Sequence, residues 1–411
     1  MAKTVPLEAA TLAWARGLFA RYYRGADVAP PVRLARREFA AFPFLVESSM
    51  RRHETLPTPS DLAAFLAREV PRHVYYSAAY YRRPAEATMA GKEWLGADLL
   101  FDLDADHLRG AEALGYVDQL VRVKERLVDL VDDFLVRDFG ISPDAMSLVF
   151  SGGRGYHVHV RDERFLPLNS PERRELVDYV QGTGFDAQRA VAPSHLNVGA
   201  GEEAHGLRAR GGVLRVQELS PPDSPGWKGR TTRAVLALLA RWQSAGRETA
   251  VRELGAYGVP PKRARAMAKI LLEEGGADRI RTSLRLEALP PALEAAFLEA
   301  VVPAVAVEVQ GETDAPVTTD IHRLIRLPSS VHGGTGFRVV PLTREGLAGF
   351  DPFRDAPLPA PAHERVAVSF REDVEYPWGD GTISGTRGAT AEIPTGAALF
   401  LTLRGEAAPP P

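Results

Sequence analysis

The feature that most constrains the fold is an alternating acidic stretch, Leu99-Leu100-Phe101-Asp102-Leu103-Asp104-Ala105-Asp106. Apolar and acidic residues alternate at period two, which predicts a β-strand with its apolar side chains in a core. Asp102 and Asp104 then lie on one face of the sheet. Two carboxylates placed in this way repel each other unless a hard divalent cation binds both, and oxygen ligands suit magnesium or manganese. A solvated strand edge is the alternative for an isolated Asp-x-Asp, so other parts of the chain must supply the rest of a metal site.

Length and composition limit the class of protein. The chain has 411 residues, enough for two or three structural units. Its net charge of -3 does not by itself indicate a nucleic-acid-binding protein. The N-terminus lacks the apolar core of a secretion signal, and no apolar run is long enough to cross a bilayer. Cysteine is absent, which excludes disulfides and thiolate metal sites and fits a reducing cytoplasm. We therefore expect a cytoplasmic protein.

A second informative stretch is a glycine-rich turn between two predicted strands within residues 148–160. Glycines let backbone amides approach an anion closely, and successive amides can surround it. Arginine and histidine beside such a turn add donors that match phosphate oxygens. An ordinary hairpin turn is the alternative, but it does not explain why serine, arginine and histidine all accompany the glycines. We expect a phosphate site formed by Ser151, Gly152, Gly153, Arg154 and His157.

A third stretch, residues 315–337, combines an acid with basic residues and a second glycine loop. Asp320 could complete the carboxylate set of Asp102 and Asp104. Arg326 and His332 could hold phosphates. Taken alone, Asp320 is equally well explained as a helix cap.

In this order, the three stretches resemble the small catalytic subunit of archaeal and eukaryotic-type DNA primases. That family carries an Asp-x-Asp strand, a Ser-Gly-Gly-Arg-Gly-x-His turn, and a distal acid followed by an Arg-Leu-x-Arg-x-Pro-x-Ser-x-His pattern. The flanking residues His73 to Tyr81, Lys92 to Asp98 and Asp138 to Ile141 are similar to the archaeal branch. The resemblance spans roughly residues 20–345 and is weak through the predicted helical insertion.

The resemblance implies a prim fold, which is an α/β fold with a mixed or antiparallel β-sheet core flanked by helices, here with a mainly helical insertion. It implies template-directed synthesis of short RNA or DNA primers on single-stranded DNA by two-metal nucleotidyl transfer. The implied catalytic acids, which also bind Mg²⁺ or Mn²⁺, are Asp102, Asp104 and Asp320. The implied nucleotide-binding residues are Ser151, Gly152, Gly153, Arg154, His157, Arg326 and His332. The implied partners are a large subunit with an iron–sulfur cluster, the DNA template and nucleoside triphosphates.

Two departures from the family pattern lead to further expectations. Relatives commonly have a cysteine-containing zinc knuckle after the acidic strand, whereas this chain has only His107 there, so we predict no structural zinc. Archaeal relatives usually carry lysine where Gly334 stands, so either nucleotide affinity is lower or Arg338 substitutes. Three alternative functions stay open at this point: a stand-alone repair or end-joining polymerase of the same superfamily, a catalytically silent nucleic-acid-binding scaffold, and a metal-dependent phosphohydrolase.

The pattern along the chain also predicts its organisation. We expect a catalytic α/β domain from residues 1–170 and 301–345, a mainly helical insertion over 171–300, and C-terminal strands and loops over 346–411. The Pro-rich end, residues 405–411, is expected to be disordered. The run from His73 to Tyr81 predicts a strand whose tyrosines either belong to the core or stack on bases. Apolar periodicity predicts helices at 110–138, 171–181, 231–244, 247–255, 260–275 and 290–300.

Overall fold

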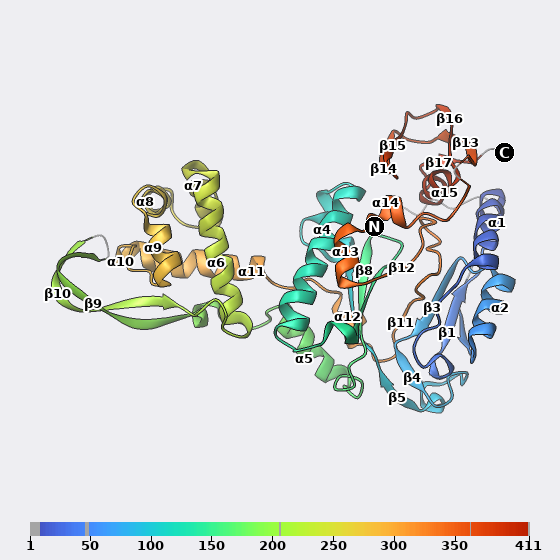
Figure 1. Cartoon of the computed structure of the whole chain (residues 1–411), viewed down its shortest axis with the longest axis horizontal. Helices are drawn as coiled ribbons and strands as arrows, with labels where there is room; N and C mark the ends of the chain where they lie inside the picture. Colours follow the sequence, from blue (N-terminus) through green and yellow to red (C-terminus); the bar gives the residue numbers. More distant parts are fainter. Residues whose placement is uncertain (1–8, 46–48, 205–206, 362, 410–411) are drawn as a thin grey trace. The chain divides into compact units, whose positions relative to one another are not determined.

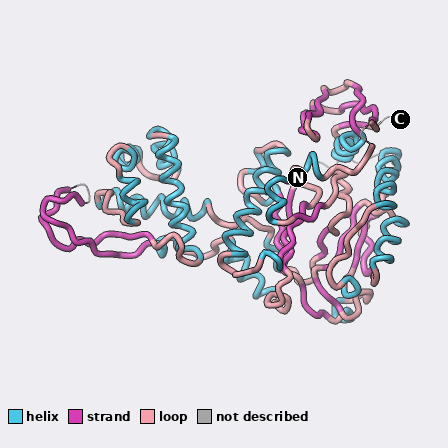
Figure 2. The backbone as a smooth tube through the Cα atoms, in the orientation of Figure 1, coloured by secondary structure: helices cyan, strands magenta, loops and turns pink. Residues whose placement is uncertain are grey.

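The computed structural model describes residues 9–45, 49–204, 207–361 and 363–409, and the chain divides into two compact units (Figure 1). Helices and antiparallel strands occur together throughout (Figure 2), which confirms the predicted α/β class. Unit 1 consists of Met1–Val128, Ile141–Val177 and Glu312–Pro411. Unit 2 consists of Asp129–Gly140 and Asp178–Gly311.

One four-stranded sheet of unit 1 carries the acidic strand. Its strands, in spatial order, are β12 (Val340–Leu342), β7 (Met146–Phe150), β8 (Gly155–Val160) and β6 (Leu99–Asp104). All of their pairings are antiparallel, and the register places Asp102 opposite His157. The predicted strand is confirmed, but it ends at Asp104, because a short 3₁₀ turn begins at Ala105. The two sequence motifs therefore lie on adjacent strands.

A second sheet of unit 1 packs against two helices. Its strands, in spatial order, are β11 (Leu324–Arg326), β3 (His73–Ser77), β1 (Phe39–Phe42) and β2 (Arg51–Glu54). Helices α1 (Ala9–Gly25) and α2 (Pro59–Glu69) pack on it (Figure 1), and Phe19, Phe65 and Tyr76 belong to the shared core. The neighbouring hairpin pairs β4 (Ala79–Tyr81) with β5 (Trp94–Ala97). Tyr76, Tyr80 and Tyr81 are buried, so these tyrosines are core residues and do not form an open base-stacking platform.

The remaining helices of the first 350 residues connect the sheets. The helix predicted over 110–138 is present as α4 (Tyr116–Asp129), which continues as a π-helical segment over Leu130–Val136. Its expected first turns form short 3₁₀ segments instead. Apart from the helices of unit 2, the other helices before residue 350 are α3 (Met89–Lys92), α5 (Ser170–Val180), α12 (Ala315–Thr319) and α13 (Arg344–Gly349).

The C-terminal part forms a small module with two short sheets around one buried helix. Its elements are α14 (Pro352–Asp355), β13 (Arg365–Phe370), β14 (Val374–Trp378), β15 (Gly381–Gly385), β16 (Thr390–Pro394), α15 (Thr395–Arg404) and β17 (Ala407–Ala408). Phe400 of α15 stacks on Phe337 with ring centroids 4.8 Å apart. Disorder from residue 405 onward was expected, yet Ala407 and Ala408 pair with β13. Residues 410–411 lie outside the described residues.

Unit 2 is mainly helical and has its own core around the fully buried Trp242. Its helices after α5 are α6 (Gly226–Ala245), α7 (Arg247–Ala256), α8 (Pro261–Leu272), α9 (Gly276–Ser283), α10 (Pro291–Ala296) and α11 (Val302–Glu308). A long hairpin of β9 (Val191–Ala204) and β10 (Leu207–Leu219) was not predicted. Glycines and charged residues interrupt its strand pattern, which explains why the sequence did not indicate it.

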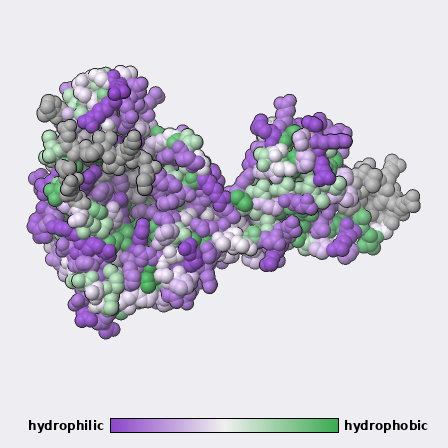
Figure 3. Space-filling view, turned by 180° about the vertical axis from the view of Figure 1, so that it is seen from behind, coloured by the Kyte–Doolittle hydropathy of each residue, from purple (hydrophilic) through white to green (hydrophobic). Residues whose placement is uncertain are grey.

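Hydrophilic residues dominate the face shown in Figure 3. Among the residues that the structure describes, no helix is both long and apolar enough to cross a membrane.

Candidate active site

One cavity of unit 1, with a volume of about 370 Å³, brings most of the predicted site together. The acids Asp102 and Asp104 line it from the same face of β6. The predicted phosphate-binding residues that also line it are Ser151, Gly153, Arg154, His157, Arg326 and His332. Gly152 lies within the same turn as Ser151 and Gly153, whereas Asp320 is not among the lining residues.

A different acid, Asp314, lies beside Asp102. The backbone amide of Asp314 donates to the carbonyl oxygen of Asp102 at 2.9 Å, and the Thr313 hydroxyl donates to the same oxygen at 3.2 Å. These bonds attach the N-terminal end of α12 to β6. Asp320 is at the other end of that helix, six residues later, which is about 9 Å along a helix axis. Its carboxylate is exposed and accepts the backbone N–H of His322. The structure therefore places Asp314, and not the predicted Asp320, beside Asp102.

The electrostatics of Asp102 reflect this crowding of acids. Burial, together with the charges of Asp104 and Asp314, raises the pKa of Asp102 to about 7, while Arg323 opposes the shift. A cation bound between the carboxylates would remove this penalty, and three carboxylates are a donor set that suits a hard divalent ion. Within the described part of the chain, no three acidic, histidine or cysteine side chains are already close enough to form a metal site.

The glycine-rich turn is held tightly against β6. Gly155 must be glycine, because a Cβ atom there would lie only 2.3 Å from the carbonyl oxygen of Leu103. Gly152 has a φ of +76°, which also favours glycine. The Ser151 hydroxyl accepts the Gly153 N–H at 3.2 Å. The turn is therefore shaped before any ligand binds.

Two side chains that follow these glycines, the cationic Arg154 and the polar His157, lie close to the acids of β6. Arg154 donates to Asp106, and its guanidinium lies 3.7 Å from the Asp104 carboxylate. Nε2 of His157 lies 3.5 Å from Oδ1 of Asp102. Burial, together with the charges of Arg326 and Arg323, lowers the pKa of His157 to about 3. His157 is therefore a neutral hydrogen-bonding group at physiological pH.

The second glycine loop closes the other side of the cavity. The Gly334 N–H donates to Nδ1 of His332 at 3.2 Å, and the same nitrogen lies 3.1 Å from the Thr335 hydroxyl. Burial holds the pKa of His332 well below its usual range, and nearby cations, first Arg326, add to the effect. The Thr335 hydroxyl donates to the carbonyl oxygen of Gly152, which joins the two loops.

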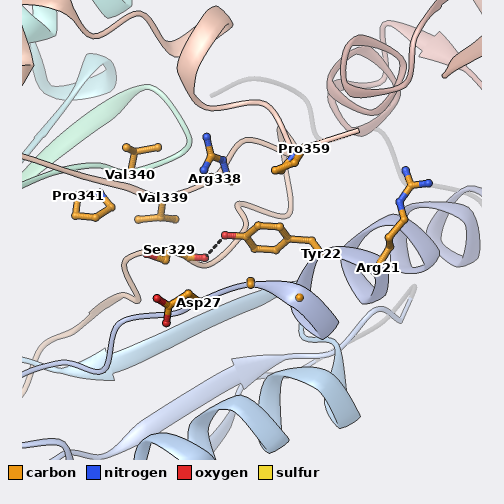
Figure 4. Close-up of a pocket in the computed structure, with 11 residues that line it drawn as sticks. Arg21, Tyr22, Asp27, Ser329, Arg338, Val339, Val340, Pro341 and Pro359 are labelled. Carbon is orange, nitrogen blue, oxygen red and sulfur yellow. Dashed lines mark hydrogen bonds between the residues drawn. The ribbon is translucent and has the colours of Figure 1, made fainter. Parts of the chain in front are cut away.

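A separate pocket of about 410 Å³ lies behind the turn that precedes His332 (Figure 4). Tyr22 of α1 crosses it and donates to the carbonyl oxygen of Ser329 at 2.8 Å. Ser329 has a φ of +62°, and this bond helps to hold its unusual backbone conformation. Arg338 lines this pocket and donates to the carbonyl oxygen of Asp355. Arg338 therefore does not take the place of the lysine that Gly334 replaces.

Comparisons with known proteins now decide the family. The family model described as DNA primase small subunit matches residues 101–344. The chain is 39% identical over 403 residues to the DNA primase small subunit PriS of Methanocella arvoryzae, covering 97% of this chain and 98% of that protein. The chain belongs to the DNA primase small-subunit family. Two further relatives support this family. The chain is 39% identical to the DNA primase small subunit PriS of Methanothrix thermoacetophila, covering 85% of this chain and 87% of that protein. It is 38% identical to the DNA primase small subunit PriS of Halobacterium salinarum, covering 85% of this chain and 86% of that protein.

Membership in the primase small-subunit family establishes the activity in outline. The chain is a nucleotidyltransferase that synthesises primers for DNA replication. The match extends well beyond the motifs, because the Methanocella arvoryzae relative aligns over nearly the whole chain.

Several residues of the primase cavity were not predicted from the sequence. Arg72 of the loop before β3, Tyr116 of α4 and Arg404 of α15 line the cavity, as does Leu403. Tyr116 donates to the carbonyl oxygen of Gly153 at 2.8 Å and so supports the glycine turn. Asp314 had one sequence signal, since an acid followed two residues later by Pro316 is typical of a helix start. Arg404 had none.

Proposed function

We propose that the cavity between β6 and the two glycine loops is the site of two-metal nucleotidyl transfer, and that it makes short RNA or DNA primers on a single-stranded DNA template. The observation that supports this most is that Asp102 and Asp104 share one cavity with a glycine turn rich in phosphate donors, while the charge of Asp314 acts on Asp102. A simple phosphohydrolase would not need two separate loops of this kind.

In this proposal the three acids are metal ligands and not a general acid–base pair. Asp102, Asp104 and Asp314 would hold Mg²⁺ or Mn²⁺. When bound, such ions lower the pKa of the attacking 3′-hydroxyl and stabilise charge on the leaving pyrophosphate. The raised pKa of Asp102 in the protein alone agrees with a site that needs a cation. No zinc is assigned to His107.

The triphosphate would lie across both glycine loops. Backbone amides near Gly152 and Gly153 would surround its oxygens, and Arg154 would turn from Asp106 toward it. The neutral imidazoles His157 and His332 would donate hydrogen bonds without adding charge. The full proposed set is Ser151, Gly152, Gly153, Arg154, His157, Arg326 and His332. Such fixed donors favour in-line geometry because they hold the reacting phosphate in one orientation.

Partners and setting follow from the relatives. Because the relatives are named as small subunits, we propose that the chain pairs with a large subunit. An iron–sulfur cluster of the complex would belong to that subunit, since this chain has no cysteine. The substrates would be single-stranded DNA and nucleoside triphosphates in the cytoplasm, at the nucleoid. Unit 1 would be the catalytic domain, with unit 2 inserted into it and residues 346–411 as its C-terminal part.

A matched pair of substitutions tests the choice of acids. Asp314→Asn should lower the rate of primer synthesis by more than about a hundredfold, because it removes a metal ligand. Asp320→Asn should leave the rate unchanged, because this exposed carboxylate caps its own loop. Incorporation of labelled nucleotide on single-stranded DNA, with Asp102→Asn as the inactive reference, measures both. Loss of activity in Asp320→Asn with retention in Asp314→Asn would restore the original assignment.

A second experiment tests the reaction itself. The purified chain, alone and with its co-purifying subunit, should start synthesis on an unprimed template and should stop when EDTA removes divalent cations. Synthesis only from a pre-existing primer would favour a repair or end-joining polymerase. A chain that binds DNA but incorporates no nucleotide in manganese, with or without its partner, would be a scaffold.

A further inference from the structure

We propose that Arg404, at the end of α15, binds the outer phosphates of the incoming nucleotide and makes the C-terminal module part of the nucleotide site. This inference rests on the proposed function of the cavity. Arg404 lies outside residues 101–344, the region matched by the family model, and none of the sequence motifs includes it.

Arg404 lies in the same cavity as the glycine turn. Its neighbours among the lining residues include Gly153, Arg154 and His332. The guanidinium lies 4.2 Å from the centroid of the Tyr116 ring. Since the Tyr116 hydroxyl donates to the carbonyl oxygen of Gly153, Arg404 is one side chain away from the backbone that would hold the phosphates.

The guanidinium is fixed on one side and open on the other. Its Nε donates to Glu406 at 2.6 Å, and its Nη2 donates to the Tyr376 hydroxyl at 3.2 Å. Its Nη1 has no hydrogen-bond partner among the described residues, and 22% of the side chain is exposed. An arginine held in this way loses little freedom when it binds phosphate, because its donors are already oriented.

The helix that carries Arg404 is itself fixed against the second glycine loop. A Cβ atom on Gly336 would lie 2.6 Å from the side chain of Leu399, so α15 and the loop are in close contact. Phe337 stacks on Phe400 of the same helix. The position of Arg404 is therefore set relative to His332, and a free surface arginine would have no such constraint.

The charged residues that line the cavity also favour a role for Arg404 in binding a triphosphate. The arginines that line it are Arg72, Arg154, Arg326 and Arg404, against the acids Asp102 and Asp104. A nucleoside triphosphate carries several negative charges on its outer phosphates. Arg154 is engaged with Asp104 and Asp106 on the side of the acids. Arg404, which Glu406 holds in an ion pair, adds a second cation on the side of Tyr116.

The test measures the affinity of the purified full-length chain for a nucleoside triphosphate, diphosphate and monophosphate in the presence of Mg²⁺, by titration calorimetry. Arg404→Gln should raise the Kd of the triphosphate roughly tenfold, because one charge-assisted hydrogen bond is lost. The Kd of the monophosphate should not change, and Arg404→Lys should recover part of the affinity. In primer synthesis the KM should rise while kcat stays the same. Arg387→Gln, an exposed arginine of the same module, is the matched control and should bind like the native chain.

Two results would overturn the assignment of Arg404. One is an unchanged triphosphate Kd in Arg404→Gln. The other is an equal loss for triphosphate and monophosphate that Arg404→Lys does not reverse, because this would indicate a structural role through Tyr116 and Glu406. Arg154→Gln separates the two proposals. If Arg154→Gln weakens triphosphate binding and Arg404→Gln does not, only the Arg404 proposal fails. If Arg154→Gln also has no effect, the proposed function of the cavity fails as well.

Discussion

A fully buried ion pair between Arg37 and Asp98 gives a demanding prediction about the stability of unit 1. The Arg37 guanidinium lies 2.7 Å from the Asp98 carboxylate, and neither side chain is exposed. The same guanidinium donates to the carbonyl oxygens of Ser77 and Ala78 at 2.7 and 3.0 Å. Arg37 lies two residues before β1 and Asp98 immediately precedes β6, so the pair joins the two four-stranded sheets of unit 1.

Removing one partner of such a pair leaves the other charge buried. Arg37→Met should therefore lower the free energy of unfolding by about 3–5 kcal/mol. That is a large part of the roughly 5–15 kcal/mol that stabilises a typical protein. The matched control is Arg51→Met, because Arg51 and Glu69 form an ion pair of nearly equal length, 2.8 Å, with Arg51 46% exposed. An exposed pair contributes at most about 1 kcal/mol, so the control should lose little.

Urea unfolding followed by circular dichroism measures both variants, with the transitions of the two units fitted separately. The double variant Arg37→Met with Asp98→Leu should be more stable than Arg37→Met alone, because no unpaired charge remains buried. Equal losses in Arg37→Met and Arg51→Met would refute the reasoning, since burial is the difference between the two pairs.

Two further predictions concern the glycine turn and pH. Gly155→Ala should separate β8 from β6 and so lower both the melting temperature and the affinity for Mn²⁺. The control Gly349→Ala should change neither, because no atom lies within 4 Å of its added Cβ. Thermal melting and titration with Mn²⁺ measure the two effects. The pKa of the buried His159 is well below its ordinary 6.5, chiefly through burial, so its stability contribution is present above pH 6.5 and is lost as pH falls below that value. The urea midpoint should fall less between neutral and acidic pH in His159→Gln than in the control variant His195→Gln, whose histidine is exposed. An equally steep fall of the midpoint with pH in both variants would contradict this.

Local patterns in the sequence predicted the strands that carry the site. The period-two alternation around Asp102 and Asp104 identified β6, and the glycines around Arg154 identified the turn between β7 and β8. These signals are local, because each depends on the geometry of a few successive residues. The prediction that His157 binds phosphate likewise depended on its few neighbours in the sequence.

The parts that the sequence did not predict depend on contacts across the fold. Asp314 and Asp320 stand at opposite ends of one short helix, and they differ in their tertiary contacts, because the Asp314 end is bonded to β6. Arg404 reaches the cavity because α15 packs against Phe337 and Gly336, which no periodicity indicates. Tertiary packing, and not local propensity, decides such positions.

The bond from Thr313 to Asp102 spans 211 residues of chain. A ribosome that adds about 5–20 residues per second needs about 10–40 s to cover that stretch. Throughout this interval the nascent chain already has Asp102 and Asp104 but lacks the segment that closes the edge of their strand. Truncated translation products therefore carry only Asp102 and Asp104 of the proposed cation site, and only a chain translated past α12 has all three acids.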